Sequence, residues 1–268
     1  MKKKRLIPIL LLRNGWLVQS KEFSRYQNLG NPETATLRLS QWASDELIFL
    51  DISRNDIYDL RRDDLGCANR HTFLEIIENI SKVVFMPMTV GGKIKSLFDI
   101  EKRLSVGADK VSINTQLFND EKIIQKSANE FGSQCIVASI DVKKENGKYF
   151  VYSNGGQKRE DYLPIDWAKK VESLGAGEIL LNSIDRDGMK TGYDIELIKG
   201  ISDVVSIPVI AAGGVGEWSH FGQVLSETKV DAVAAANIFQ YSDQSVYLAK
   251  KYLYEHNFNV RPPDLLEI

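Results

Sequence analysis

The chain has few of the side chains that bind metals or form disulfides. It contains only two cysteines and three histidines among 268 residues. Cys67 and Cys135 are too far apart in the sequence to form a typical metal-ligand pair, and the histidines, at positions 71, 220 and 256, have no regular spacing. We therefore expect no metal, no cofactor and a reducing, cytoplasmic setting.

The sequence also lacks a long apolar run and an excess of charge of either sign. The run that begins at Leu6 contains Pro8 and stops at Arg13. It is shorter than the roughly 20 residues of a membrane span, and no small-residue cleavage site of a secretion signal follows it. The formal net charge is −2, which argues against a general affinity for nucleic acid or anionic membranes. We expect neither as a partner.

Short apolar runs rich in Val, Ile, Leu and Ala alternate with longer stretches of helical period, as in a parallel sheet buried on both faces. The expected strands are 6–12, 46–52, 86–90, 109–114, 135–141, 178–183, 208–212 and 231–236. The expected helices include 71–81, 96–105, 120–130, 164–174, 194–201 and 219–226. This alternation is typical of a closed barrel or of an open doubly wound sheet.

An internal repeat favours the barrel. Gly91 precedes Asp109, and Gly213 precedes Asp231, by the same 18 positions. A chain built of two similar (βα)4 halves closes naturally into an eightfold barrel. We therefore predict a single (β/α)8 TIM barrel domain over residues 1–268, with a hairpin-bearing loop at 143–161.

Ligands of such barrels bind where the strands end at their C-terminal side. Glycine pairs follow the third and seventh strands, where they would let backbone N–H groups approach an anion. In the alternative interpretation, these glycines only make tight turns. The residues that we expect to bind a phosphate group or another ligand are Gly91, Gly92, Lys93, Asn114, Thr115, Asp187, Gly188, Gly213, Gly214 and Asn237.

The carboxylates near these strand ends are the candidates for acid–base chemistry. Asp141 ends an apolar strand, and Leu11 ends the matching strand of the first half. A site that needs two facing carboxylates therefore has only one of them here. Asp51 and Asp187 are further candidates, although either could instead cap a helix or hold a loop.

Four charged residues begin strands at the opposite end of the barrel: Arg5, Glu46, Lys110 and Glu178. Their side chains would meet near the lower axis, where two cations and two anions can neutralise one another. Such a ring could gate a passage through the barrel, or it could be a plain polar plug.

These motifs resemble the HisF family, the cyclase subunits of imidazole glycerol phosphate synthase. The resemblance covers roughly residues 4–261, and its most specific strings are DELIFLDI at 45–52, GADKVSINT at 107–115, FGSQ at 131–134, GAGEILL at 175–181, SIDRDG at 183–188 and NVR at 259–261. It implies a barrel that docks a HisH-like glutaminase on its N-terminal face and passes ammonia to a site at the other end. Arg5, Glu46, Lys110 and Glu178 would form the gate of that passage, and Asp109 would lie at the glutaminase interface.

The sequence departs from the family pattern on the cyclase side. The family uses two aspartates; Asp141 matches the second, but Leu11 stands in place of the first. Gln19 replaces a lysine, Lys93 replaces a glycine, and Asn237 replaces a serine. The loop 54–69 is longer than usual.

This pattern resembles the HisF-like proteins of sugar acetamidino-modification systems. There a HisH-like glutaminase and a HisF-like barrel supply ammonia to an ATP-dependent amidotransferase, which converts an acetamido group of a surface glycan or nonulosonic acid to an acetamidino group. We therefore expect a subunit that channels ammonia. One alternative is a true cyclase of histidine biosynthesis, with Asp51 or Asp187 replacing the missing aspartate. Another is a barrel that binds a different phosphorylated ligand or a sugar nucleotide, as Lys93 and loop 54–69 suggest.

Overall fold

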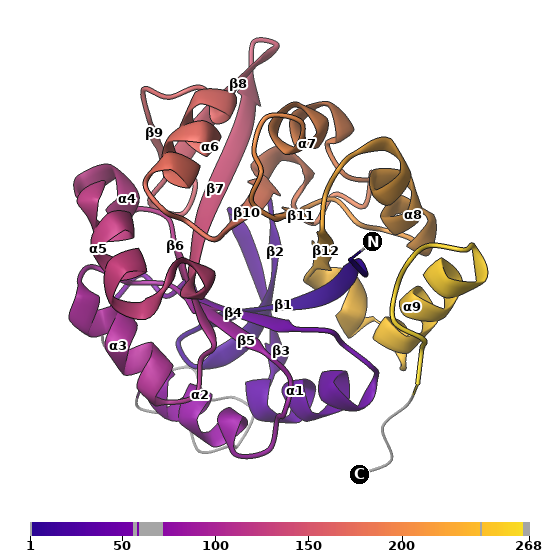
Figure 1. The fold of residues 1–268 in the computed structure, drawn as a ribbon. Coiled ribbons are helices and arrows are strands. Elements are labelled where there is room, and N and C mark those ends of the chain that lie inside the picture. The colour runs from indigo at the N-terminus through magenta and orange to yellow at the C-terminus, as the bar shows by residue number, and fades with distance from the viewer. Residues whose placement is uncertain (1, 56–57, 59–71, 242, 265–268) are drawn as a thin grey trace.

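The structure is a computed structural model that describes residues 2–55, 58, 72–241 and 243–264. Eight parallel strands form a closed barrel, because β12 pairs with β1 and β10 pairs with β7. These strands are β1 (Arg5–Arg13), β4 (Leu47–Asp51), β5 (Met88–Gly91), β6 (Lys110–Ile113), β7 (Ile136–Glu145), β10 (Glu178–Ser183), β11 (Val209–Ala212) and β12 (Ala232–Ala235). Figure 1 shows them at the centre, with the helices around them. The predicted (β/α)8 barrel is confirmed.

The described helices are α1 (Pro32–Gln41), α2 (Phe73–Ser81), α3 (Leu97–Ser105), α4 (Gln116–Asn119), α5 (Lys122–Phe131), α6 (Pro164–Ser173), α7 (Ile195–Ser202), α8 (Trp218–Glu227) and α9 (Ser245–Glu255). Side chains at their N-termini explain several of the starts. Asn31 accepts two backbone N–H groups ahead of α1, and Thr72 and Glu75 form a capping box ahead of α2. Residue 71, where we expected α2 to begin, lies outside the described residues. None of the described helices is long and apolar enough to cross a membrane.

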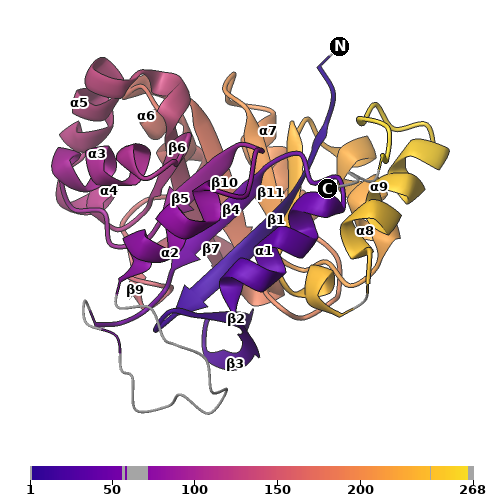
Figure 2. The same cartoon turned by 90° about the horizontal axis from the view of Figure 1, so that it is seen from below.

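Two antiparallel hairpins extend the barrel at its C-terminal end. The expected hairpin at 143–161 is present, as β7 pairs with β8 (Lys148–Ser153), which pairs with β9 (Lys158–Arg159). Because of this pairing, β7 continues to Glu145 instead of ending at residue 141 as predicted. The other hairpin, β2 (Trp16–Lys21) and β3 (Arg25–Gly30), was not predicted. Figure 2 shows it at the lower end of the barrel, opposite the N-terminus.

Alternation along the strands separates an inner core from an outer one. Ile7, Ile9, Ile48, Val137 and Leu180 belong to a buried cluster inside the barrel, with Leu11 packed against it. A larger cluster lies between the strands and the helices. Along β1 the alternation places residues 5, 7, 9 and 11 on one face, with residue 5 at the N-terminal floor and residue 11 at the C-terminal mouth.

Candidate functional site

A cavity of about 650 Å³ opens at the mouth of the barrel. All but one of the mouth residues singled out from the sequence line this cavity: Leu11, Asp51, Gly92, Lys93, Asn114, Thr115, Asp141, Asp187, Gly188, Gly213, Gly214 and Asn237. The exception is Gly91, which is buried in β5 beside Leu50 and Ser112. The structure therefore brings the predicted residues together, and their roles stay predictions.

Asp141 lies buried where β7 reaches the cavity. Its Oδ2 accepts a hydrogen bond from Asn114 Nδ2 at 2.8 Å. Burial, and after it the negative charge of Asp187, raise the pKa of this carboxyl to about 7. A carboxyl with a pKa near neutrality can both accept and donate a proton at physiological pH.

Leu11 lies across the mouth from Asp141, because β1 and β7 are four strands apart in either direction around the barrel. It packs with the inner apolar cluster, as does Leu50 of the neighbouring strand β4. The cavity therefore has an apolar wall at the position that faces Asp141.

Asp187 is the carboxylate that acts electrostatically on Asp141, and the β2–β3 hairpin holds it in place. Its Oδ2 accepts hydrogen bonds from Ser20 Oγ at 2.6 Å and from the Phe23 N–H at 3.3 Å. Burial raises the pKa of Asp187 despite these two hydrogen bonds. Asp187 thus fixes the hairpin to the loop after β10.

Of the family departures, Gln19 lies in this hairpin and Asn237 contacts it. Asn237 donates to the Ser20 carbonyl oxygen at 2.7 Å and accepts from the Ser20 N–H at 3.4 Å. Gln19 donates to Gln27 at 2.6 Å and accepts from the Tyr241 hydroxyl at 2.8 Å. Gln19 does not line the cavity.

Asp51 and Lys93 form a second polar cluster at the mouth. The Asp51 carboxylate accepts from the N–H and the hydroxyl of Ser53, at 2.9 and 2.5 Å, and Lys93 Nζ lies 3.6 Å from its other oxygen. Lys93 also donates to the Asn55 carbonyl oxygen. These contacts support the loop-holding interpretation of Asp51. Of the loop 54–69, only residues 54, 55 and 58 are described.

The glycines of the two predicted anion sites are required by the backbone. Gly92, Gly213 and Gly214 all have positive φ, and a Cβ on Gly214 would lie 2.1 Å from the Gly192 carbonyl oxygen. Tight turns alone would therefore demand these glycines. Anion binding at them stays a prediction.

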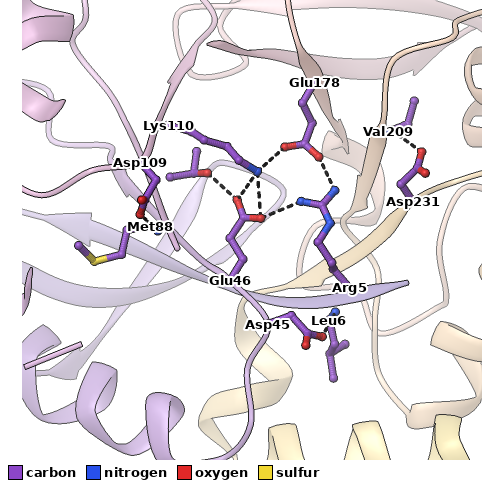
Figure 3. Close-up of polar contacts among 11 residues, drawn as sticks. Arg5, Leu6, Asp45, Glu46, Met88, Asp109, Lys110, Glu178, Val209 and Asp231 are labelled. Atoms are coloured by element: carbon purple, nitrogen blue, oxygen red, sulfur yellow. Dashed lines mark hydrogen bonds and ion pairs between the residues drawn. The ribbon is translucent and has the colours of Figure 1, made fainter. Parts of the chain in front are cut away.

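The four predicted floor residues form a closed ring of ion pairs (Figure 3). Glu46 is 2.7 Å from Arg5 Nη1 and 3.1 Å from Lys110 Nζ. Glu178 contacts Arg5 and lies 2.9 Å from Lys110. Thr89 Oγ1 adds a hydrogen bond of 2.7 Å to Glu46. The ring is charge-balanced and lies below the apolar inner cluster.

Three aspartates around this ring share a role that we did not predict. Each precedes one strand and accepts the N–H group at or next to the start of the neighbouring strand: Asp45 from Leu6 at 2.9 Å, Asp109 from Met88 at 2.8 Å and Asp231 from Val209 at 3.3 Å. Gly177 takes the corresponding position before β10, where a Cβ would lie 2.1 Å from the Ser133 carbonyl oxygen. Asp109 is exposed, and its place at a glutaminase interface stays a prediction.

Metal-binding side chains do not gather anywhere in the described part of the chain: no group of three His, Cys, Asp or Glu is placed to hold an ion. His220 accepts the Gly216 N–H at 3.1 Å, and His256 lies in an exposed contact with Tyr252. Cys67 and His71 lie outside the described residues.

Comparison with known proteins agrees with this architecture. A family model described as "Histidine biosynthesis protein" matches residues 5–245. Over 259 residues the chain is 42% identical to the imidazole glycerol phosphate synthase subunit HisF of Hydrogenobaculum sp. (strain Y04AAS1), a match that covers 96% of this chain and 98% of that protein. The family model's match includes all eight strands of the barrel and the charged ring at its floor. The chain belongs to the HisF family.

Proposed function

We propose that this chain is an ammonia-conducting subunit that has lost ring closure. It docks a HisH-like glutaminase at its floor and passes ammonia to an ATP-dependent amidotransferase that converts an acetamido group of a sugar to an acetamidino group. The single observation that carries this proposal is the pairing of an intact floor ring with Leu11 opposite Asp141. The choice of the sugar-modifying acceptor rests on the resemblance to acetamidino-modification systems.

The interior of the barrel suits a small neutral base. Above the ring, the inner wall is built from apolar side chains such as Ile7, Ile48 and Leu180. The free-energy cost of removing water from an ammonium ion there would be high, whereas the cost for neutral ammonia is much lower. The hydroxyl of Ser112, which also lines the cavity, is buried without a hydrogen-bond partner. It offers a polar contact between the ring and Asn114.

The proposal is tested by reconstituting the complex with the HisH-like glutaminase and the candidate amidotransferase from the same genome. Glutamine should support acetamidino-sugar formation only when the barrel is present. Ammonium chloride at high pH should bypass both the glutaminase and the barrel, which controls for an active amidotransferase. Failure of the barrel to bind the glutaminase, or glutamine-dependent product without the barrel, would contradict the proposal.

A second candidate function is the cyclase reaction of histidine biosynthesis, with Asp187 as the second carboxylate. The electrostatic action of Asp187 on buried Asp141 is the observation that favours it. Turnover of the bisphosphorylated ribulosyl-aminoimidazole substrate with ammonia is the assay. If the wild type turns over the substrate and Asp187→Asn abolishes turnover, Asp187 acts as the second carboxylate. Absence of turnover by the folded wild-type protein rejects the candidate.

A further inference from the structure

Phe85 has one of the most exposed apolar side chains of the described residues, at 94% of its possible surface. It lies in the connection between α2 and β5, where Val83 is also exposed, at 47%. The connection itself is well anchored. Val84 between them is buried, and the N–H groups of Val83 and Val84 both donate to the Ile80 carbonyl oxygen at 3.0 Å. Phe85 is therefore held outward by an ordered backbone.

The connection that carries Phe85 is joined to the charged ring. The Pro87 carbonyl oxygen accepts the Leu47 N–H at 3.0 Å, next to Glu46. Thr89, two residues further on, donates to the Glu46 carboxylate at 2.7 Å. Phe85 thus lies on the floor side of the barrel, in the connection that leads to Thr89 and the ring through which ammonia would enter. In the ring, the side chains of Arg5 and Lys110 are 25% and 20% exposed, so solvent reaches this entrance.

We propose that Phe85, together with Val83, is the apolar anchor that seats the glutaminase subunit over the floor. This inference rests on the proposed function, since it takes the glutaminase as the occupant. An entrance open to water would lose ammonia to the bulk solvent, so the partner must cover the ring. Phe85 is the most exposed large apolar side chain of the described residues, and it lies on the side of the barrel that this partner would cover. Single exposed aromatic side chains that fill a partner's pocket commonly dominate the affinity of an interface.

Phe98 provides a matched control. It is also an exposed phenylalanine, at 60%, but it lies in the first turn of α3, at the mouth end of the barrel. A partner seated on the floor would contact Phe85 and leave Phe98 free. Both side chains are exposed, so neither substitution by alanine should change the thermal unfolding midpoint.

The experiment measures the Kd of the full-length barrel for the HisH-like glutaminase from the same genome, by calorimetry. Phe85→Ala should weaken binding by a factor on the order of 10 to 100, whereas Phe98→Ala should leave it within about twofold. At a saturating concentration, the Phe85→Ala barrel should still support full glutamine-dependent product formation, because the anchor acts through affinity.

Each other outcome has a clear meaning. Wild-type affinity in Phe85→Ala, or a larger effect of Phe98→Ala, overturns the anchor while leaving the proposed function intact. A wild-type barrel that does not bind the glutaminase overturns both. If Phe85→Ala converts a dimeric barrel to a monomer in solution without changing glutaminase affinity, a second copy of this chain covers Phe85 and the anchor is rejected.

Discussion

Leu11 and Asp141 face each other across the mouth of the barrel, one in the apolar wall and one on the polar side. Asp141 has Asn114 as its hydrogen-bond partner, whereas Leu11 belongs to the inner apolar cluster. The mouth therefore has a carboxyl group at Asp141 and none at the position that faces it.

Restoring the second carboxylate should restore ring closure. In the double variant Leu11→Asp/Gln19→Lys, cyclase turnover with ammonia should exceed that of the wild type by a factor of order 10² or more, because positioned acid–base groups contribute that much. The measurement is single-turnover product formation. Leu11→Asn/Gln19→Lys is the control, as it has a similar shape without the acid–base group. Equal rates in the wild type and the Asp variant would contradict the prediction.

Asp141 should make the barrel less stable as the pH rises from about 4 to 7. Its pKa is about 7 in the folded chain against a usual value of 3.8, so in this window the folded state keeps a proton that the unfolded chain has lost. The free energy of unfolding then falls by up to about 1.4 kcal/mol per pH unit and levels off above pH 7.

Asp141→Asn removes this titration and should be the more stable variant above pH 7. Urea unfolding of both proteins at several pH values is the measurement. The difference between their free energies of unfolding should grow from pH 4 to 7 and then remain constant. Parallel curves would show that Asp141 ionises normally.

Removing one cation from the floor ring should destabilise the barrel. Lys110→Met leaves Glu46 and Glu178 sharing Arg5, and the loss should be about 2–3 kcal/mol, below the value for a fully buried pair because Lys110 is a fifth exposed. Adding Glu178→Gln restores the charge balance and should recover part of the loss.

The control for this prediction is Lys126→Met, because Lys126 forms an exposed ion pair with Asp120 at 3.1 Å. It should change the free energy of unfolding by no more than about 0.5 kcal/mol. Denaturant unfolding compares the three variants. A Lys110→Met barrel as stable as the control would mean that the ring contributes no net stability.

Lys93 occupies a left-handed backbone conformation, with φ of 54°. Lys93→Ala keeps this strained conformation and loses the ammonium group near buried Asp51, whereas Lys93→Gly loses the ion pair but relieves the strain. We expect the glycine variant to be more stable than the alanine variant by about 1 kcal/mol. Thermal or urea unfolding checks this, and equal stabilities would refute it.

The barrel strands were predictable because both of their faces are buried, which makes them continuous apolar runs. The ends of those runs located Asp141, Leu11 and the floor ring. The β2–β3 hairpin was not predicted: 25–30 is largely polar, none of its residues is buried, and it lacks the apolar alternation that indicates a strand. The contact of Asp187 with Ser20 was missed because it joins residues 167 positions apart, which a local sequence pattern does not indicate.

Exposure within an apolar run could not be read from the sequence either. Residues 83–86 form an unbroken apolar stretch directly before Pro87 and β5, and the expected strand 86–90 included only the last of them. In the structure Val84 is buried and Phe85 points into solvent. Which residues of such a run leave the core depends on where the chain turns, and a local apolar pattern does not contain that information.

The aspartates that bind neighbouring strand starts are unevenly distributed between the two halves of the barrel. The first half contributes Asp45 and Asp109, while the second has Asp231 and, before β10, Gly177 pressed against the Ser133 carbonyl. A chimaera made by duplicating residues of the first half would carry four such aspartates, and one made from the second half only two. The two halves are therefore not interchangeable building blocks, and the first is the better starting point for a symmetric engineered barrel.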